Sequence, residues 1–402
     1  MFDIISLKGG LENVQGFFFD GVNSGFKKEG NDLGFIRSDE PFSVSAIFTS
    51  NRFAAAPIKH FRKYPKNFKS NFILLNSKNA NAMTGENGVS DIDELFANLE
   101  KKINLINPIM SSTGVIGYRL KKDKIIAAFD KFDFNARNSH NVATAIMTTD
   151  TVNKEVAVSF DIAGKKVTLG GMSKGSGMIH PNMCTMLAFL TTDIAIEKSL
   201  LQEAVSEVVS DTFNMITVDG DTSTNDTLLC MANGKAGNDI VKDKNDDYET
   251  FKNALFYVCE FLAKKMAADG EGASKLFEAK VVNAKTKEDA RTLSRAIVGS
   301  NLSKAAIFGC DANFGRFLCA MGYSGAQFDQ NDVELFFESK AGRIEVFHKG
   351  TPLDFDEDKA LEIMKEETVT VFVDMHEGDA EATAWGCDLT YDYVKINADY
   401  RS

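Results

Sequence analysis

The sequence is poor in cysteine, proline, histidine and tryptophan, and it has no long apolar run. Its 402 residues include six cysteines, six prolines, five histidines and one tryptophan. No apolar stretch approaches the roughly 20 residues that a membrane-spanning helix needs. The N-terminus also lacks the basic segment and apolar run of a signal peptide. We therefore expect a protein of the cytoplasm that has no membrane partner.

The cysteines and histidines are too dispersed to predict a disulfide framework or a metal cluster. The six cysteines all lie at or after residue 184 and form no C-x-x-C pair, which is typical of reduced thiols. The histidines are His60, His140, His180, His348 and His376. A zinc site needs several such ligands at short spacing, so the sequence predicts no metal.

The charge balance is acidic and argues against binding of polyanions. Forty-five Lys and Arg residues against 57 Asp and Glu residues give a net charge of -12, which opposes binding to nucleic acid or to an anionic membrane. One basic and aromatic stretch, residues 59–69, could be taken for a nucleic-acid patch. Because the overall charge is acidic, and because Pro57 precedes the stretch and Pro65 lies within it, we interpret it as a solvated loop or edge strand and expect no nucleic-acid partner.

Hydrophobic periodicity predicts a mixed chain of helices and strands. Strands are predicted at residues 72–75, 125–129, 156–160, 277–282, 344–347 and 369–373. Helices are predicted from an Asp91 cap, from a capping box at Ser199 and Gln202, and from Phe251 to a stop at Gly270. Helices and strands do not alternate regularly and no repeat is visible, which disfavours a TIM barrel, a Rossmann sheet or a solenoid. We therefore expect a layered α+β fold.

Residues 170–190 form the most unusual segment, a glycine-rich loop followed by an apolar run over residues 186–190. It does not match a phosphate-binding loop, because Lys174 precedes its glycine and serine. Gly171-x-Ser173-x-Gly175 matches a nucleophile elbow, the mark of a serine hydrolase, but no helix pattern follows the serine directly. The segment therefore leaves that alternative open and does not establish it.

A third interpretation places a nucleophile at the head of the apolar run, at Cys184 or Thr185. A threonine hydroxyl needs a base, and cutting the chain before Thr185 would free an α-amine of pKa ~8 to act as one. On spacing alone, the start of a buried strand is the better explanation of Thr185.

Two further polar loops could support a site. Residues 111–117 form a loop of small residues in which a hydroxyl and an unobstructed N–H could point at an oxyanion. Residues 219–227 are rich in Asp and Thr, but they lack the glycine spacing and the closing Glu of a calcium loop. We interpret the second loop as a turn or as support for an active site.

Taken together, these segments resemble the ornithine acetyltransferase family of arginine biosynthesis, also called glutamate N-acetyltransferase. The matching motifs are Asn79-Ala-Asn-Ala, Ser112-Thr-Gly-Val-Ile-Gly117, Met147-Thr-Thr-Asp-Thr151, Lys174-Gly-Ser-Gly-Met-Ile, Pro181-Asn-Met-Cys-Thr-Met-Leu187, Asp219-Gly-Asp-Thr-Ser-Thr-Asn-Asp226, Asp269-Gly-Glu-Gly272, Asp311-Ala-Asn-Phe-Gly-Arg316, Ala384-Trp-Gly-Cys-Asp388 and Tyr393-Val-Lys-Ile-Asn-Ala-Asp-Tyr400. They cover essentially the whole chain in order.

The resemblance implies the layered α-β-β-α sandwich of self-cleaving ArgJ-like and DmpA-like proteins. It also implies autocatalytic cleavage between Cys184 and Thr185, which yields an α chain of residues 1–184 and a β chain of residues 185–402. The two chains are expected to associate, as an α2β2 heterotetramer. Thr185 is expected to accept acetyl from N2-acetylornithine and to pass it to glutamate. No cofactor is implied, although acetyl-CoA is a possible co-substrate and would make the enzyme multifunctional.

The family's site residues map onto two groups of positions in this sequence. Thr113 and Gly114 would form the oxyanion hole for Thr185. The implied substrate contacts are Thr148, Lys174, Thr185, Glu271, Asn397 and Ser402. Lys174 suits a substrate carboxylate and Glu271 suits the δ-ammonium of ornithine.

The sequence departs from the family pattern at three places. Cys184 stands where Ala is usual before the nucleophile, and cleavage one residue earlier would make this thiol the terminus. Ser402 stands where Thr is common, and Asp311-Ala-Asn-Phe replaces Asp-Pro-Asn-Trp. The alternatives to an acetyltransferase remain a serine hydrolase that uses Ser173 and a non-catalytic amino-acid-binding protein.

Overall fold

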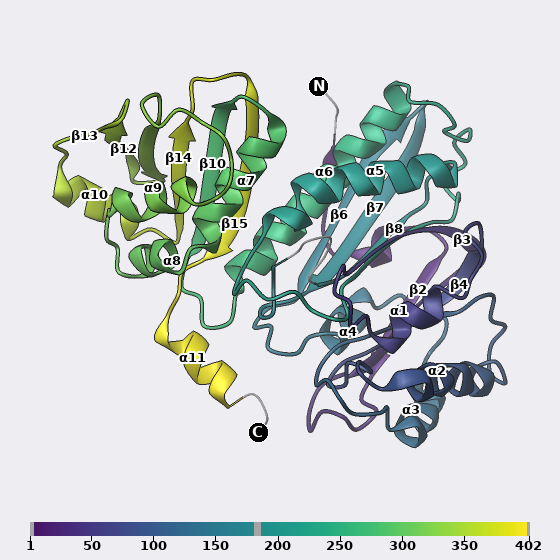
Figure 1. Cartoon of the computed structure of the whole chain (residues 1–402). Coiled ribbons are helices and arrows are strands. Elements are labelled where there is room, and N and C mark those ends of the chain that lie inside the picture. Colours follow the sequence, from purple (N-terminus) through teal and green to yellow (C-terminus); the bar gives the residue numbers. More distant parts are fainter. Residues whose placement is uncertain (1–3, 181–185, 400–402) are drawn as a thin grey trace. The chain divides into compact units, whose positions relative to one another are not determined.

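The computed structural model of the chain describes residues 4–180 and 186–399, and it divides into two compact units (Figure 1). The first unit consists of residues 1–175, 182–210 and 222–262, and the second of residues 176–181, 211–221 and 263–402. These units do not coincide with the chains expected from cleavage after residue 184. Both expected chains contribute strands to the first unit.

The first unit contains most of the regular structure of the N-terminal two thirds of the chain. Its elements are β1 (Ile5–Leu7), β2 (Phe17–Val22), β3 (Leu33–Phe48), α1 (Ala56–Phe61), β4 (Lys69–Asn76), α2 (Gly85–Leu99), β5 (Ile109–Ser112), α3 (Lys122–Ala128), α4 (Ser139–Ala145), β6 (Lys154–Ile162), β7 (Lys165–Lys174), β8 (Leu187–Thr192), α5 (Lys198–Asp211), β9 (Thr227–Ala232) and α6 (Asp246–Ala268). Helix α6 continues from this unit into the second. Among the described residues, no helix is long and apolar enough to cross a membrane.

A nine-stranded mixed sheet organises the first unit. Its order is β1-β6-β7-β8-β9-β3-β4-β5, with β2 beside β3. The first part of β3 pairs with β2 and β4, whereas its last part pairs with β9. The pairing of β3 with β4 shifts register between Arg37 and Phe42. Before this shift β3 also pairs with β2, and after it β3 pairs with β9. One long strand therefore belongs to both halves of the sheet.

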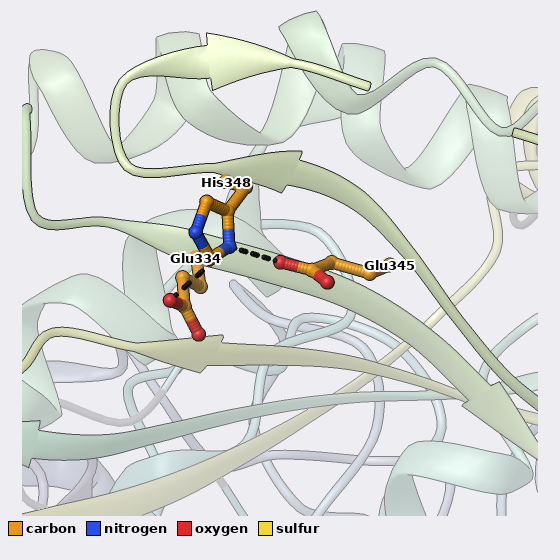
Figure 2. Close-up of side chains that lie close together, drawn as sticks. All are labelled: Glu334, Glu345 and His348. Atoms are coloured by element: carbon orange, nitrogen blue, oxygen red, sulfur yellow. Dashed lines mark hydrogen bonds and ion pairs between the residues drawn. The ribbon is translucent and has the colours of Figure 1, made fainter. Parts of the chain in front are cut away.

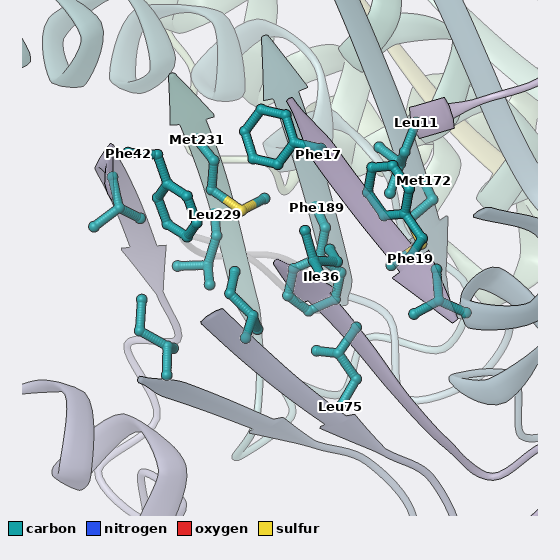
Figure 3. Packing of buried hydrophobic residues seen from close by; sticks show 14 of the residues in the cluster. Leu11, Phe17, Phe19, Ile36, Phe42, Leu75, Met172, Phe189, Leu229 and Met231 are labelled. Atoms are coloured by element: carbon teal, nitrogen blue, oxygen red, sulfur yellow. The ribbon is translucent and has the colours of Figure 1, made fainter. Parts of the chain in front are cut away.

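The two halves of this sheet pack face to face. On β4, Ile73 and Leu75 point into a buried cluster that also holds Phe189 of β8 and Leu229 of β9 (Figure 3). The intervening β4 residues point into a different cluster, as the two-residue period of a strand requires. The core of the first unit therefore lies between a layer of β6–β9 and a layer of β2–β5.

Helices cover the outer faces of both layers. Residues of α2 and α3 join the second cluster, on the outer face of β4 and β3. Helices α5 and α6 lie over β6 and β7 in Figure 1. The approach of α6 is so close that a Cβ on Gly171 of β7 would come within 2.8 Å of Val258 and 2.9 Å of Leu262. The first unit is thus an α-β-β-α sandwich, and the expected fold class is confirmed.

The second unit is built on a sheet of its own. Its elements are β10 (Leu276–Ala284), α7 (Lys287–Gly299), α8 (Asn301–Phe308), α9 (Phe314–Gly322), β11 (Glu334–Ser339), β12 (Gly342–His348), β13 (Thr351–Pro352), α10 (Glu357–Met364), β14 (Thr368–Asp374), β15 (Ala380–Cys387) and α11 (Tyr391–Ala398). The strand order is β13-β12-β11-β14-β10-β15. Val369, Val371 and Val373 alternate inward along β14, and α7 packs against β10 and β15.

Four local predictions from the sequence are wrong. Ser199 and Gln202 were expected to form a capping box, but α5 begins at Lys198, and Gln202 Oε1 accepts from Ala46 N–H at 3.2 Å. Residues 59–69 were expected as a solvated loop or edge strand, but α1 extends to Phe61 and buries His60.

The other two errors concern a strand and a helix cap. Residues 125–129 were expected as a strand but belong to α3 and a following 3-10 turn, because a short apolar run fits either structure. Asp91 was expected to cap a helix, but α2 begins at Gly85 and Asp91 lies inside it. The buried carboxylate of Asp91 binds Arg119 at 2.5 Å and Lys122 at 3.1 Å, so ion pairs explain this residue better than capping does.

We expect Asp193→Asn to stabilise the protein near pH 8. Asp193 directly follows β8 in the sequence, and its side chain is buried. Its Oδ1 accepts a hydrogen bond from Thr168 N–H at 2.7 Å. Burial raises the pKa of this carboxyl to about 6. The native state therefore holds a proton that the unfolded state loses between about pH 4 and 6, so stability falls as pH rises through this window and stays lower above it. The effect is at most about 3 kcal/mol.

Thermal unfolding at pH 4 and pH 8 measures this effect. The midpoint of Asp193→Asn should exceed that of the wild type at pH 8, and the difference should shrink at pH 4. The exposed Asp130, which pairs with Lys102, supplies the control Asp130→Asn. An equal shift at both pH values would contradict the explanation.

Candidate active site

Three polar side chains of the first unit converge at the end of β7. Lys174 is the last residue of this strand, and its Nζ donates to Thr148 Oγ1 at 2.8 Å. The same ammonium lies 3.5 Å from Thr113 Oγ1. Lys174 is almost completely buried. The structure therefore brings together three of the residues that the sequence singles out, although they are distant from one another along the chain.

The Thr113 loop is held in place by the neighbouring strand and by a buried asparagine. Thr113 N–H donates to Asn76 O at 3.0 Å, directly after β5 ends. Asn225 Nδ2 donates to the carbonyls of Ser112 at 2.8 Å and of Ala80 at 2.6 Å. Asn225 belongs to the polar loop of residues 219–227, so this loop supports the site, as one of the two sequence interpretations proposed.

Gly114 occupies a position that only glycine can fill. Its φ is +130°, and a Cβ would lie 2.2 Å from the carbonyl carbon of Lys78. The structure shows no hydrogen bond from the N–H of Gly114 to any described residue. A hydroxyl at Thr113 and an open N–H at Gly114 thus stand next to each other in the chain, beside a buried ammonium.

A buried carboxylate, which sequence reasoning missed, lies behind Lys174. Asp150 Oδ1 accepts from Lys154 Nζ at 2.8 Å and from Gly175 N–H at 2.7 Å, and Oδ2 accepts from Thr148 N–H at 3.0 Å. Burial alone would raise the pKa of Asp150, but the charges of Lys174 and Lys154 outweigh it and hold the pKa well below its ordinary value. Asp150 is therefore an anion within a cationic site.

The described chain resumes close to this group. Leu187, the first residue of β8, pairs with Lys174 of β7. Met186 O accepts from Thr227 N–H at 2.8 Å. Cys184 and Thr185, the expected cleavage site and nucleophile, lie outside the described residues. Sequence places Thr185 two residues before Leu187, and hence two residues before the partner of Lys174.

Asp226 is a second buried carboxyl near the start of β8. Burial raises the pKa of Asp226 well above its ordinary value, and hydrogen bonds from Ser223, Thr49 and the backbone of Met186 offset only part of this effect. Burial therefore favours the neutral form of this carboxyl over the charged form. No local pattern in the sequence distinguishes Asp226 from the other acidic residues of its loop.

Two further expected site residues meet in the second unit. Asn397 of α11 donates through Nδ2 to Glu271 Oε2 at 2.7 Å. Glu271 is buried, and its N–H donates to Ser176 O at 2.8 Å. A Cβ on Gly177 would lie 2.3 Å from the carboxylate of Glu271, so a larger residue there would displace this carboxylate. The remaining expected contact, Ser402, lies outside the described residues.

The position of Ser173 does not match a nucleophile elbow. An elbow presents its serine on a sharp turn between a strand and a helix. Ser173 instead lies within β7, paired with Lys154 of β6 and Ala188 of β8. Its buried Oγ has no hydrogen-bond partner in the described part of the chain. No described residue is positioned to act as its base.

A separate cluster of charged groups lies at one end of the second sheet. Glu334, Glu345 and His348 hold their donor atoms within 4.8 Å of one another (Figure 2). His348 Nδ1 is 2.7 Å from Glu345 and 3.3 Å from Glu334, and His376 Nε2 is 3.2 Å from Glu334. Sequence spacing did not reveal this group, because adjacent strands β11 and β12 bring its members together. We describe it as ion pairs and assign it no part in the chemistry.

The donors around Lys174 determine what the first site can do. A hydroxyl can accept a hydrogen bond from an ammonium and still donate its own hydrogen. An open N–H beside such a hydroxyl can stabilise the negative charge that develops on an acyl oxygen. The site therefore holds the kinds of donor that acyl-transfer chemistry uses.

Comparison with known proteins identifies the family. The ArgJ family model matches residues 18–402. The arginine biosynthesis bifunctional protein ArgJ of Caldanaerobacter subterraneus subsp. tengcongensis is 45% identical over 400 residues, which cover 98% of this chain and 99% of that protein. The protein of the same name from Bacillus subtilis is 44% identical over 404 residues, covering 99% and 98%. The chain belongs to the ArgJ family.

A solved structure agrees with this assignment. The crystal structure of arginine biosynthesis bifunctional protein ArgJ from Bacillus halodurans is similar with a TM-score of 0.51 and 45% sequence identity. The similarity covers 53% of this chain and 99% of that one.

Proposed function

We propose that this protein moves an acetyl group from N2-acetylornithine to glutamate through an acetyl ester on Thr185. Family membership over residues 18–402 supports a role in arginine biosynthesis, as do relatives named for that pathway. The observation that carries the chemistry is the convergence of Lys174, Thr148 and Thr113 at the end of β7. These residues supply a cation and hydroxyl groups where an acyl transfer needs them.

The chain first cuts itself between Cys184 and Thr185: the Thr185 hydroxyl attacks the Cys184 carbonyl, the peptide bond is exchanged for an ester, and water hydrolyses this ester. The cut frees the α-amine of Thr185, whose pKa of ~8 suits a base at neutral pH. The α chain of residues 1–184 and the β chain of residues 185–402 then stay associated, since β7 pairs with β8 and β3 pairs with β9 across the two chains. Two such cleaved protomers form the α2β2 heterotetramer.

The first half of the reaction transfers acetyl to the enzyme. The α-amine of Thr185 takes the proton of the Thr185 hydroxyl, and the oxygen attacks the acetyl carbonyl of the donor. Thr113 and Gly114 donate hydrogen bonds to the resulting oxyanion. When the intermediate collapses, the C–N bond breaks, the α-ammonium returns its proton to the departing amine, and ornithine leaves an acetyl ester behind.

The second half reverses these steps with a different amine. Glutamate attacks the ester, the same oxyanion donors act again, and Thr185 is released as N-acetylglutamate forms. Lys174 and Thr148 bind the substrate carboxylate, Glu271 binds the δ-ammonium of ornithine, and Asn397 and Ser402 complete the contacts. Acetyl-CoA acetylates the same hydroxyl if it serves as an alternative donor, so no resident cofactor is required.

Labelled donor tests this mechanism directly. Intact-mass analysis should find two fragments split after residue 184. Incubation with N2-acetylornithine labelled in its acetyl group should release ornithine without glutamate and leave the label on the fragment that begins with Thr185. Adding glutamate should then remove the label.

Two other outcomes would contradict the proposal. An uncut chain that still transfers acetyl would exclude the freed amine as the base. Stabilisation of the protein by ornithine without any transfer would instead identify an amino-acid-binding protein. Repeating the assay with acetyl-CoA as the sole donor decides whether the enzyme has a second activity.

A further inference from the structure

Lys154 differs from the other lysines around the site in being completely buried within the first unit. It is the first residue of β6, and its backbone pairs with Ser173, the residue before Lys174. The antiparallel register therefore puts both lysines at the same end of two adjacent strands. The side chains of Lys154 and of Asp150 are both 0% exposed. A buried cation at this place requires a role, because transferring a charge out of water is costly.

The carboxylate of Asp150 is shared unequally between the two lysines. Lys154 Nζ binds Oδ1 at 2.8 Å, whereas Lys174 Nζ stands 3.8 Å from Oδ2. The longer separation is beyond hydrogen-bond distance. Gly175 N–H and Thr148 N–H take further acceptor positions on the same carboxylate. Lys174 is thus close enough to be attracted by the charge of Asp150, but its ammonium does not donate a hydrogen bond to this carboxylate.

This arrangement determines what Lys174 can donate to. An ammonium has three hydrogens, and two of those on Lys174 are directed to Thr148 Oγ1 at 2.8 Å and to Thr113 Oγ1 at 3.5 Å. If Asp150 lost its bond to Lys154, its carboxylate would attract Lys174 and take the remaining hydrogen. A substrate carboxylate would then compete with a buried anion for the same donor.

We propose that Lys154 is a positioning residue, which occupies the Asp150 carboxylate so that Lys174 keeps a donor for the carboxylate of the substrate. The inference rests on the proposed role of Lys174 as a substrate contact. It adds a residue that touches no substrate and acts through Asp150, and it identifies an α-carboxylate as the substrate group that depends on the pair.

Lys154→Met tests the proposal, because methionine keeps the length of the side chain and removes the charge. We expect KM for N2-acetylornithine to rise about 10- to 100-fold, the range for loss of a charge-assisted hydrogen bond, with kcat within about 3-fold of the wild type. A donor in which the α-carboxylate is replaced by a carboxamide should show no such rise. Lys102→Met, which breaks the exposed pair with Asp130, is the matched control.

A double variant separates positioning from stability. In Lys154→Met with Asp150→Asn, no carboxylate remains to capture Lys174, so we expect KM to return to within about 5-fold of the wild type. A general loss of packing would not be repaired by a second buried substitution. If Lys154→Met does not fold, the double variant alone decides, because a 10-fold or greater rise in its KM overturns the proposal.

The outcomes also separate this inference from the proposed function. An unchanged KM in Lys154→Met, with an active wild type, overturns the role of Lys154 and leaves acetyl transfer intact. An equal rise in KM for the carboxylate and carboxamide donors overturns the role as well. If the wild type transfers no acetyl group at all, the proposed function itself fails.

Discussion

Replacing Thr185 with alanine is expected to leave the 402-residue chain in one piece and to abolish acetyl transfer. The substitution removes the hydroxyl that attacks the preceding bond and later carries the acetyl group. Loss of a covalent nucleophile lowers kcat by at least about 10⁴-fold. Intact-mass analysis detects the uncut chain, and release of ornithine from N2-acetylornithine measures the remaining turnover.

Three other variants show whether this loss belongs to the Thr185 hydroxyl. Thr185→Ser keeps a hydroxyl and should still be cut and active. Cys184→Ala should be cut at the same bond, since the thiol of Cys184 is not the nucleophile. Ser173→Ala should behave as the wild type, because the Ser173 Oγ is buried in β7 and has no partner among the described residues. A Thr185→Ala protein that is still split after Cys184 would remove the mechanism.

Helices with long regular stripes could be predicted from the sequence. Phe251, Leu255, Val258 and Leu262 recur at intervals of three and four residues, and all four lie buried on α6. Such a stripe has no comparable interpretation as a strand. The apolar run of residues 125–129 is too short to show a period, so hydrophobic periodicity could not distinguish a helix from a strand there. The prediction that Asp91 caps a helix failed for another reason, because its ion-pair partners Arg119 and Lys122 are distant in sequence.

The site residues could be named from sequence motifs, but their geometry could not. Thr113 and Lys174 are 61 residues apart, and Thr148 and Lys174 are 26 apart. Their contacts depend on the register of β6, β7 and β8, which no local pattern specifies. The Asp150–Lys154 pair was missed for a different reason: its members are only four residues apart, but no local pattern distinguishes a buried pair from a solvated one. The link between this pair and the site appears only in the structure, in which strand β7 places Lys174 Nζ 3.8 Å from Asp150 Oδ2.

The division into two units shows a further limit of sequence reasoning. The family resemblance implied a layered sandwich but did not say which residues form it. The structure assigns that sandwich to the first unit and gives residues of the C-terminal third a separate six-stranded sheet. Parallel pairing of β10 with β14 joins segments about 90 residues apart, and pairings of that kind are hard to infer from periodicity.

Thr113→Val is expected to lower kcat about 10²- to 10³-fold while KM changes little. Valine has nearly the shape of threonine but lacks the hydroxyl that we assign to the oxyanion. An oxyanion donor acts mainly in the transition state, so its loss costs about 3 to 4 kcal/mol of barrier without weakening the bound substrate to the same degree. The N–H of Gly114 remains in the variant and accounts for the residual activity. Steady-state kinetics on cleaved protein measure both constants.

The same loop supplies the control for Thr113→Val. Ser111 has a buried Oγ without a hydrogen-bond partner in the described residues, so Ser111→Ala removes a hydroxyl two positions away and should leave kcat within about 3-fold of the wild type. Thr113→Ser should retain most of the activity because it keeps the donor. If Thr113→Val also kept kcat within about 3-fold, Thr113 would not be a donor to the oxyanion. Its hydroxyl would then serve only as a neighbour of Lys174, at the 3.5 Å seen in the structure.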